Sequence, residues 1–439
     1  MDLATWVLGA VGDRAEAEVR VTGGNLALTR FANSFIHQNV GEEGNTVALR
    51  LAVDGRIASG TTTNTGREAL GRFVEDALER ATLQPVDADW PGLASPSPDV
   101  GVDHHDAATA ETSPAERAAM VRAFVDAGPG MRAAGFCSTQ SVEIAFANTN
   151  GVRREGRSTE AVLDGIHQTD TSAGSAHAAA VRLADIDAAA AGTQAARRAR
   201  DGAAAYDIKP GEYEVVLTPE CVATICVFLA YYGFNGKLHN EGQSFVELGE
   251  QQFDERITLV DDVTDPRAMS VGFDYDGTPR GRLDLVSAGV TTAVTHDRRT
   301  ARKAGSDSTG HAIPGSEVYG PFPTTVFMAE GDESVDDLIA GVDRGLYVAT
   351  FNYCRVLEPK TMAVTGLTRN GTFMIENGRI TGAVTGLRFT QSFLAALAPG
   401  RVLGVGNDGR WADSEFGAGL MHVPSLRLAG WHFTGGASG

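Results

Sequence analysis

Residues 215–232 read VVLTPECVATICVFLAYY, and this stretch marks the change from a mixed half of the chain to a sheet-rich half. The run 215–217 predicts a short strand. Pro219 then stands where proline favours the first turn of a helix. From Cys221 onward the helix would be apolar on every side, which is typical of a fully buried helix. We therefore predict a core helix over 219–232, with Cys221 and Cys226 as buried, inert thiols.

After this helix the chain is dense in glycine, valine and threonine. Asn377-Gly378 lies between two strand-like runs and predicts a tight hairpin. A single short helix is expected near 334–342. These features predict that residues 206–439 form a large, mainly antiparallel β-sheet domain with few helices.

Before the helix, residues 1–205 predict a mixed α/β domain with two sub-regions, 1–84 and 107–205, joined by a proline-rich loop. Short strands are expected on either side of Gly23-Gly24, and Asp54-Gly55 predicts a type I′ hairpin. Helices are expected in three segments: 67–83, the segment that begins with the capping box Ser113-Pro114-Ala115-Glu116, and the alanine-rich segment 183–205. This order of elements predicts an α+β fold rather than a doubly wound α/β fold.

The composition limits the class of protein. Of the 439 residues, 56 are acidic and 37 are basic, which gives a formal charge of −19, and 43% are hydrophobic. This balance fits a folded protein and argues against binding to nucleic acid, which requires clustered lysine and arginine. No window reaches the roughly 18 apolar residues that span a membrane, and Asp2 gives the N-terminus the wrong charge for a signal peptide. Four cysteines without a C-x-x-C pair predict a reduced, cytoplasmic protein.

Four segments contain residue types found in functional sites but lack the structural context that those sites need. Residues 404–409 read GVGNDG, but the dinucleotide-binding pattern needs a helix after the glycines and none is predicted. The segments 104–106 and 239–241 hold histidines and acids, which we expect to be solvated loop residues. The segment 306–311 contains serine, aspartate and histidine without the G-x-S-x-G elbow of serine hydrolases. None of the ten histidines is followed by glutamate, so the chain has no H-E-x-x-H or H-E-x-x-x-H motif.

Motifs spread along nearly the whole chain resemble the TldD/PmbA (modulator of gyrase, microcin-processing) metallopeptidase family. They are residues 28–34, 215–220, 244–245, 248–250, 259–262, 273–279, 308–310, 345–348, 375–378 and 435–436. The resemblance implies a peptidase built as a TldD–TldE pair. In the TldD member, the helix after the Leu-x-Pro-Glu strand carries H-E-x-x-x-H, and a late cysteine completes the zinc site.

Carried over by position, the family's helix ligands and base fall on Val227, Phe228 and Tyr232. The cysteine position falls near Asn407 and Asp408, far along the chain from Cys354. The resemblance therefore implies a TldE/PmbA-type subunit with no metal or other cofactor of its own. Zinc is expected in a TldD-type catalytic partner, and the heterodimer would act on unfolded peptides, with no nucleic acid or membrane involved.

Two alternatives remain open at this point. The chain can be a stand-alone peptide-binding or scaffold protein without a peptidase partner. It can also be a hydrolase in its own right, with carboxylates as acid, base or metal ligands. The candidate carboxylates are Asp261, Asp262, Asp274 and Asp276, although acids in glycine-rich turns more often cap loops.

Overall fold

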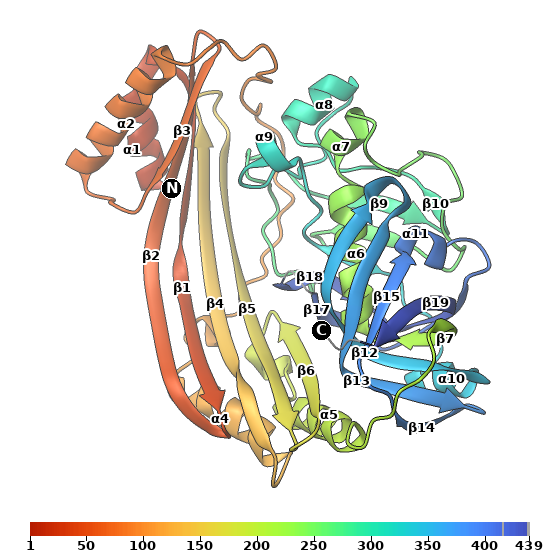
Figure 1. The fold of residues 1–439 in the computed structure, drawn as a ribbon. Coiled ribbons are helices and arrows are strands. Elements are labelled where there is room, and N and C mark those ends of the chain that lie inside the picture. Colours follow the sequence, from red (N-terminus) through yellow and green to blue (C-terminus); the bar gives the residue numbers. More distant parts are fainter. Residues whose placement is uncertain (415–416, 437–439) are drawn as a thin grey trace.

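A computed structural model of the protein describes residues 1–414 and 417–436. A tall, curved sheet formed by the N-terminal half stands beside a more compact, sheet-rich C-terminal half (Figure 1). This arrangement confirms the predicted α+β class, with a mainly antiparallel C-terminal half. None of the described helices is long and apolar enough to cross a membrane.

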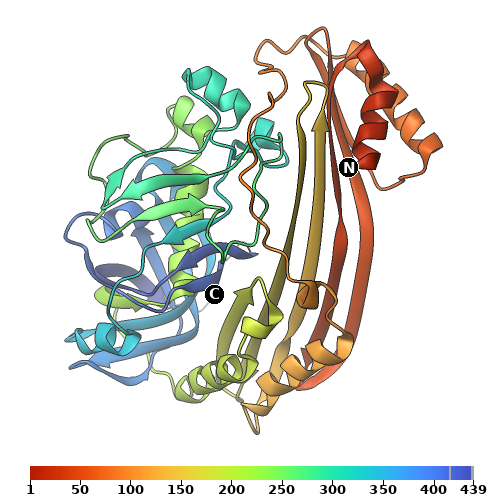
Figure 2. The ribbon, with the colours of Figure 1, turned by 180° about the vertical axis from the view of Figure 1, so that it is seen from behind.

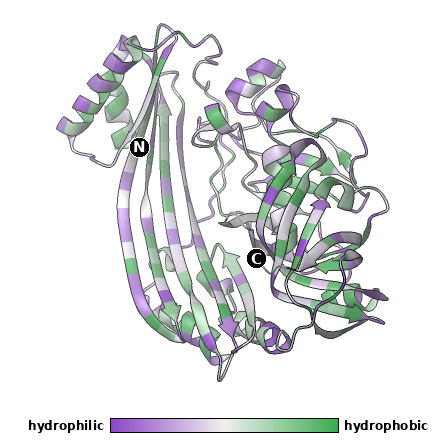
Figure 3. Cartoon of the chain, viewed as in Figure 1, coloured by the Kyte–Doolittle hydropathy of each residue, from purple (hydrophilic) through white to green (hydrophobic). Residues whose placement is uncertain are grey.

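The tall sheet, called the long sheet below, has six antiparallel strands in the order β3-β2-β1-β4-β5-β6. Its strands are β1 (Glu16–Ala32), β2 (Phe35–Val53), β3 (Arg56–Thr62), β4 (Arg132–Asn148), β5 (Arg153–Gln168) and β6 (Ala173–Ala180). Apolar and polar residues alternate along several of these strands, as Figure 3 shows. Asp54 and Gly55 both have positive φ in the β2–β3 turn, which confirms the predicted hairpin.

The longer helices of the N-terminal half cover the two ends of the long sheet (Figures 1 and 2). At one end α1 (Asp2–Val11) and α2 (Arg67–Thr82) pack against β1–β3 through a cluster that includes Val7, Leu49 and Leu70. At the other end α4 (Pro114–Asp126) and α5 (Ala188–Asp201) pack through a cluster around Phe124. Helix α4 has the predicted capping box, in which the Ser113 and Glu116 side chains each accept a hydrogen bond from the other residue's backbone N–H.

The expectation of separate short strands around Gly23-Gly24 is wrong, because β1 runs through both glycines. Gly24 has φ +144°, and a Cβ atom there would meet the Ser141 carbonyl oxygen at 1.9 Å. Glycine is required at this point so that the backbones of β1 and β4 can approach each other. The glycines therefore preserve the strand pairing instead of ending it.

The C-terminal half contains two sheets. One has the order β10-β9-β8-β11-β18-β17, formed by β8 (Leu259–Asp262), β9 (Arg282–Ser287), β10 (Val290–Thr291), β11 (Val326–Met328), β17 (Arg410–Ser414) and β18 (Gly417–Val423). The other has the order β12-β7-β19-β15-β13-β14, with β16 beside β19 and a further β12–β13 pairing that closes a ring of strands. Its strands are β7 (Gly211–Leu217), β12 (Arg344–Glu358), β13 (Ala363–Glu376), β14 (Arg379–Ala383), β15 (Leu387–Ser392), β16 (Val402–Val405) and β19 (Leu426–Gly436).

Helix α6 (Pro219–Tyr232) packs between these two sheets, against β12 on one side and β17 and β18 on the other. Every residue from Pro219 to Ala230 is buried, which confirms the predicted core helix. The remaining short helices lie in loops: α3 (Ala107–Ala110), α7 (Gly236–Asn240), α8 (Arg298–Ala304), α9 (Ser316–Tyr319), α10 (Val335–Ala340) and α11 (Phe393–Ala396).

The proline-rich segment after α2 runs between the long sheet and the C-terminal half (Figure 2). The Arg298 guanidinium of α8 donates to the carbonyl oxygens of Pro91, Gly92 and Leu93. On the opposite side, the Asn148 amide of β4 donates to the Ala94 carbonyl oxygen at 2.8 Å. This segment thus connects the two halves through its backbone carbonyls.

Candidate functional site

The positions to which the resemblance assigns a zinc site lie on the C-terminal part of helix α6. Val227 and Phe228 are 5% and 3% exposed and belong to the main hydrophobic core. The Phe228 ring meets Phe393 edge-on, with centroids 5.9 Å apart, and stacks on Tyr232 at 6.2 Å. Aromatic packing therefore fills the space around these positions.

The two residues near the expected cysteine position, Asn407 and Asp408, lie in the turn between β16 and β17. The Asn407 N–H donates to the Glu333 carbonyl oxygen at 2.8 Å. The Asp408 carboxylate accepts hydrogen bonds from the Ser425 N–H and hydroxyl at 2.8 and 2.7 Å. Both residues stabilise the turn, and Asp408 also lies 3.7 Å from the guanidinium of Arg410.

Arg410 connects this turn to the first turn of helix α6. It donates to both carboxylate oxygens of Glu220, at 2.7 and 2.9 Å, and Glu220 is only 5% exposed. Burial alone would raise the pKa of Glu220, but the nearby guanidinium groups of Arg410 and Arg198 lower it to about 2. Glu220 is therefore a buried anion that is already paired with cations.

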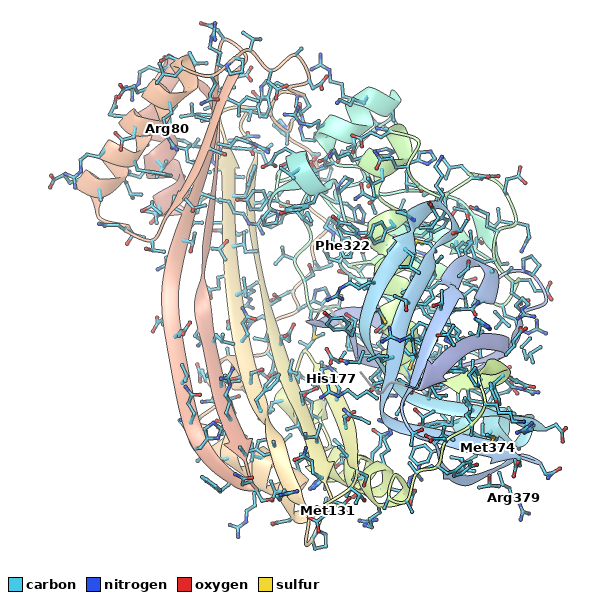
Figure 4. The ribbon with its side chains drawn as sticks, in the orientation of Figure 1. Arg80, Met131, His177, Phe322, Met374 and Arg379 are labelled. Atoms are coloured by element: carbon cyan, nitrogen blue, oxygen red, sulfur yellow. The ribbon has the colours of Figure 1, made fainter. Side chains whose placement is uncertain are left out.

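A cavity of about 270 Å³ lies beside Glu220, between the long sheet and the C-terminal half. Asp164 of β5 and His177 of β6 enter it from the long sheet, and Asp413 enters from β17. One ligand atom of each of these three side chains lies within 4.8 Å of the other two. Figure 4 shows His177 between the long sheet and the C-terminal half.

The three side chains lie close enough for His177 and Asp164 to act on the Asp413 carboxyl. The Nδ1 atom of His177 lies 3.3 Å from the Asp164 carboxylate. Burial raises the pKa of the Asp413 carboxyl to about 6; the His177 charge opposes this shift, while Asp164 and Glu220 add to it. An imidazole between two carboxylates can exchange a proton or bind a metal ion, so this cluster is the best candidate for chemistry in the described part of the chain.

Sequence analysis did not single out Asp164, His177, Glu220, Arg410 or Asp413. Only Glu220 carries a local signal, because a charged residue within a run of buried apolar residues requires a buried partner. The other four become neighbours only when β5, β6 and β17 come together, and no spacing in the sequence indicates that approach.

Two of the four aspartates proposed for a carboxylate hydrolase stabilise turns. The Asp262 carboxylate accepts a hydrogen bond from the Thr264 N–H at 2.9 Å. Asp274 accepts hydrogen bonds from the N–H groups of Asp276 and Thr278, at 3.0 and 2.8 Å. These contacts agree with the loop-capping interpretation.

The other two aspartates form ion pairs with arginines, Asp261 with the buried Arg280 and Asp276 with the half-buried Arg50. Arg280 donates to Asp261 at 2.8 Å, and His311 lies 3.1 Å from the same carboxylate. Asp276 shares the Arg50 guanidinium with Glu18 of β1, so this cluster joins the long sheet to the C-terminal half. The structure thus assigns all four carboxylates a structural role.

The prediction of solvated histidines in the segments 104–106 and 239–241 is wrong for His104, and His311 of the segment 306–311, for which no exposure was predicted, is buried too. His104 is buried, and its Nδ1 atom lies 2.7 Å from the Ser270 carbonyl oxygen, because the preceding segment is held between the two halves. His311 is also buried, 2.8 Å from the Thr309 hydroxyl. His239 is half-buried, and burial lowers its pKa.

The glycine pattern at 404–409 lies in a turn between two strands, and no helix follows it, so it is not a dinucleotide-binding loop. All four cysteines are buried thiols outside any disulfide bond. Burial raises the pKa of the Cys226 thiol to about 12 and that of the Cys221 thiol well above its usual range. Both observations confirm the prediction of inert thiols.

Two domains of one sequence family match the chain. The PmbA/TldA metallopeptidase C-terminal domain matches residues 210–435, and the PmbA/TldA metallopeptidase domain 1 matches residues 17–81. A metalloprotease of Methanothermobacter thermautotrophicus is 27% identical over 220 residues, 49% of this chain and 47% of that protein. A metalloprotease TldD homologue of Haemophilus influenzae is 28% identical over 218 residues, 48% of this chain and 45% of that protein. The matched region spans about half the length of these relatives.

Solved structures share the fold over the whole chain. TldE from Thermococcus kodakarensis superimposes with a TM-score of 0.88 and 19% identity, covering 99% of each chain. A candidate modulator of DNA gyrase from Bacteroides thetaiotaomicron superimposes with a TM-score of 0.85 and 22% identity, covering 99% of this chain and 98% of that one. With the C-terminal domain match extending over half of its residues, the chain belongs to the PmbA/TldD metallopeptidase family.

Proposed function

We propose that this chain is the TldE/PmbA-like, non-catalytic subunit of a heterodimeric TldD–TldE zinc metallopeptidase. The observation that carries the proposal is the packing of helix α6, where Val227 and Phe228 are buried and the Phe228 ring stacks on Tyr232. A catalytic zinc needs imidazole, thiolate or carboxylate ligands and an open position for water. The apolar side chains at these positions provide neither.

In this proposal the catalytic partner supplies the zinc, the activated water and the general-base glutamate. The present chain closes a chamber that unfolded peptides can enter and folded proteins cannot. An unfolded peptide can be held by pairing with an exposed strand edge, since main-chain hydrogen bonds do not depend on its sequence. The site of action is expected to be the cytoplasm.

Co-expression with a TldD-type homologue from the same genome tests this proposal. We expect one stable complex in size-exclusion chromatography with light scattering, and cleavage of an unstructured fluorogenic peptide by the complex only. Replacing the motif glutamate of the partner with glutamine should abolish cleavage. Phe228 occupies the corresponding position in this chain, and Phe228→Leu should leave cleavage unchanged because this side chain only packs in the hydrophobic core.

Other outcomes identify the alternative functions. Peptide binding by the chain alone, without complex formation, would indicate a stand-alone peptide-binding or scaffold protein. Cleavage by the purified chain alone would indicate an enzyme in its own right. Its loss on changing Asp261 or Asp276, in a variant whose circular dichroism shows that it still folds, would point to a carboxylate hydrolase.

A further inference from the structure

Asp164, His177 and Asp413 form a cluster, called the Asp–His–Asp cluster below, at the junction between the long sheet and β17. The residues come from three strands, and their ligand atoms lie within 4.8 Å of one another. The cluster faces the cavity of about 270 Å³. It is separate in sequence and in secondary structure from positions 227, 228 and 232 of helix α6.

The cluster contains polar atoms whose hydrogen-bonding capacity is not used by the protein. His177 is only 5% exposed, and its Nε2 atom is buried without a hydrogen-bond partner in the described part of the chain. Asp413 is half-buried and lines the same cavity, and its carboxylate has no hydrogen-bond donor among residues 1–414 and 417–436. Buried polar groups are normally satisfied, so a group from outside the protein is expected here.

The charges around the cavity also favour a cation. Arg410 and Arg198 act on the Glu220 carboxylate, and Arg410 is bound to it directly. Arg198 also donates hydrogen bonds to the Ser175 carbonyl oxygen and the Tyr347 hydroxyl. Arg369 also lines the cavity and donates to the Asn352 side chain. Within the described residues, neither Asp164 nor Asp413 forms an ion pair with lysine or arginine, and Asp164 is paired with the His177 imidazole.

We propose that the Asp–His–Asp cluster binds one divalent ion of the zinc or manganese class. An imidazole nitrogen with two carboxylates is a donor set suited to these ions, and water in the cavity can complete the coordination. Zinc binds nitrogen and oxygen donors at about 2.0–2.2 Å, so the proposal requires these three side chains to converge on one ion. The expectation that this chain holds no metal was based on the positions on helix α6, and the ion proposed here would lie at a different place.

An ion in this position would join the two halves of the protein. Asp164 and His177 belong to the long sheet and Asp413 to the C-terminal half, so the bound ion would stabilise their junction. An ion that binds only the folded state raises the melting temperature with its concentration. Its role is therefore structural, and it does not require the peptidase partner.

The test uses the full chain, stripped with a chelator and then dialysed. Titration calorimetry with ZnCl₂ and with MnCl₂ should show one equivalent bound, and saturating ion should raise the melting temperature. His177→Ala and Asp413→Asn should each weaken binding at least about tenfold and remove most of the thermal shift. His37→Ala and Asp170→Asn, exposed residues of the same two types, should behave as the wild type.

Two results would overturn the inference. One is the absence of stoichiometric binding of either ion, which would mean that the cluster only shares protons. The other is binding that survives both His177→Ala and Asp413→Asn, which would place the ion elsewhere. If either variant fails to fold, as judged by circular dichroism, Asp164→Asn takes its place because that side chain is 35% exposed. The readout involves no peptidase partner, so the proposed function can fail or hold independently.

Discussion

The rings of Phe228 and Tyr232 lie nearly parallel, with their centroids 6.2 Å apart and 9° between their planes. They are four residues apart on helix α6, so they share one face of the helix. In the resemblance to the metallopeptidases, the same two positions correspond to a general base and a zinc ligand. Here they form an aromatic pair against the core, and this difference can be tested directly.

Phe228→Glu should strongly destabilise the protein. The side chain is 3% exposed and packs on Phe393, so the substitution removes aromatic packing worth about 3–5 kcal/mol and buries a carboxyl without a partner. Thermal melts at neutral pH should show a large drop or poor expression. Phe35→Glu, at a side chain 59% exposed on β2, is the matched control and should have little effect. A shift below about 2 °C for Phe228→Glu would contradict the core assignment, since even 1 kcal/mol moves a melt by about that much.

Arg410→Met should destabilise the protein because it leaves the Glu220 carboxylate buried without its main partner. Breaking a buried pair costs about 3–5 kcal/mol, whereas an exposed pair contributes about 1 kcal/mol or less. The exposed pair Arg401–Glu212 therefore provides the control, and Arg401→Met should change urea stability little. Adding Glu220→Gln to Arg410→Met should restore part of the loss. An equal effect of the two arginine changes would show that Glu220 does not need Arg410.

The same pair predicts a loss of stability in acid. The pKa of Glu220 is lowered from its usual 4.5 to about 2 in the folded protein. Its contribution is therefore complete above pH 4.5 and is lost as the pH falls from 4.5 towards 2. The difference in urea stability between wild type and Glu220→Gln, measured across this window, should shrink as the pH falls.

Glu18→Gln should stabilise the protein increasingly as the pH rises. Burial raises the pKa of Glu18 from 4.5 to about 8; the attraction of Arg50 opposes this shift, and the charges of Asp276 and Asp274 add to it. A folded pKa above the unfolded one means that stability is complete below pH 4.5 and is lost as the pH rises towards 8. By pH 8 the variant should gain at least about 1.4 kcal/mol relative to the wild type, the equivalent of one pKa unit. Glu42→Gln, an exposed glutamate on β2, should give a difference independent of pH.

His296 should make the protein sensitive to acid over a higher range. Burial, together with the charges of His239 and His311, lowers its pKa from 6.5 to about 4. The unfolded chain then binds a proton that the folded chain does not, so stability falls as the pH drops from 6.5 to 4, by up to about 3 kcal/mol. His296→Gln should reduce this slope in urea unfolding measured at pH 7 and pH 4.5, whereas His37→Gln at an exposed site should not. An unchanged slope in His296→Gln would refute the assignment.

Local features of the sequence determined much of the fold. The apolar run that begins at Cys221 specifies a buried helix because no face of it can be left in water. The capping box at Ser113 and the Asp54-Gly55 turn each act within a few residues. Val227, Phe228 and Tyr232 could likewise be seen to lack the ligands of a zinc site from the sequence alone.

Other features depend on contacts between distant segments, and only the tertiary structure decided them. Gly23-Gly24 reads as a break, yet it lies within β1, because the β4 backbone approaches so closely that only glycine fits at position 24. His104 reads as a loop residue, yet it is buried where the two halves meet. Asp164, His177 and Asp413 carry no shared spacing, and pairing and packing of strands far apart in the chain bring them to one cavity. Local sequence specifies which residues form a helix or a turn, whereas the position of a charged group beside another is fixed by long-range packing of the core.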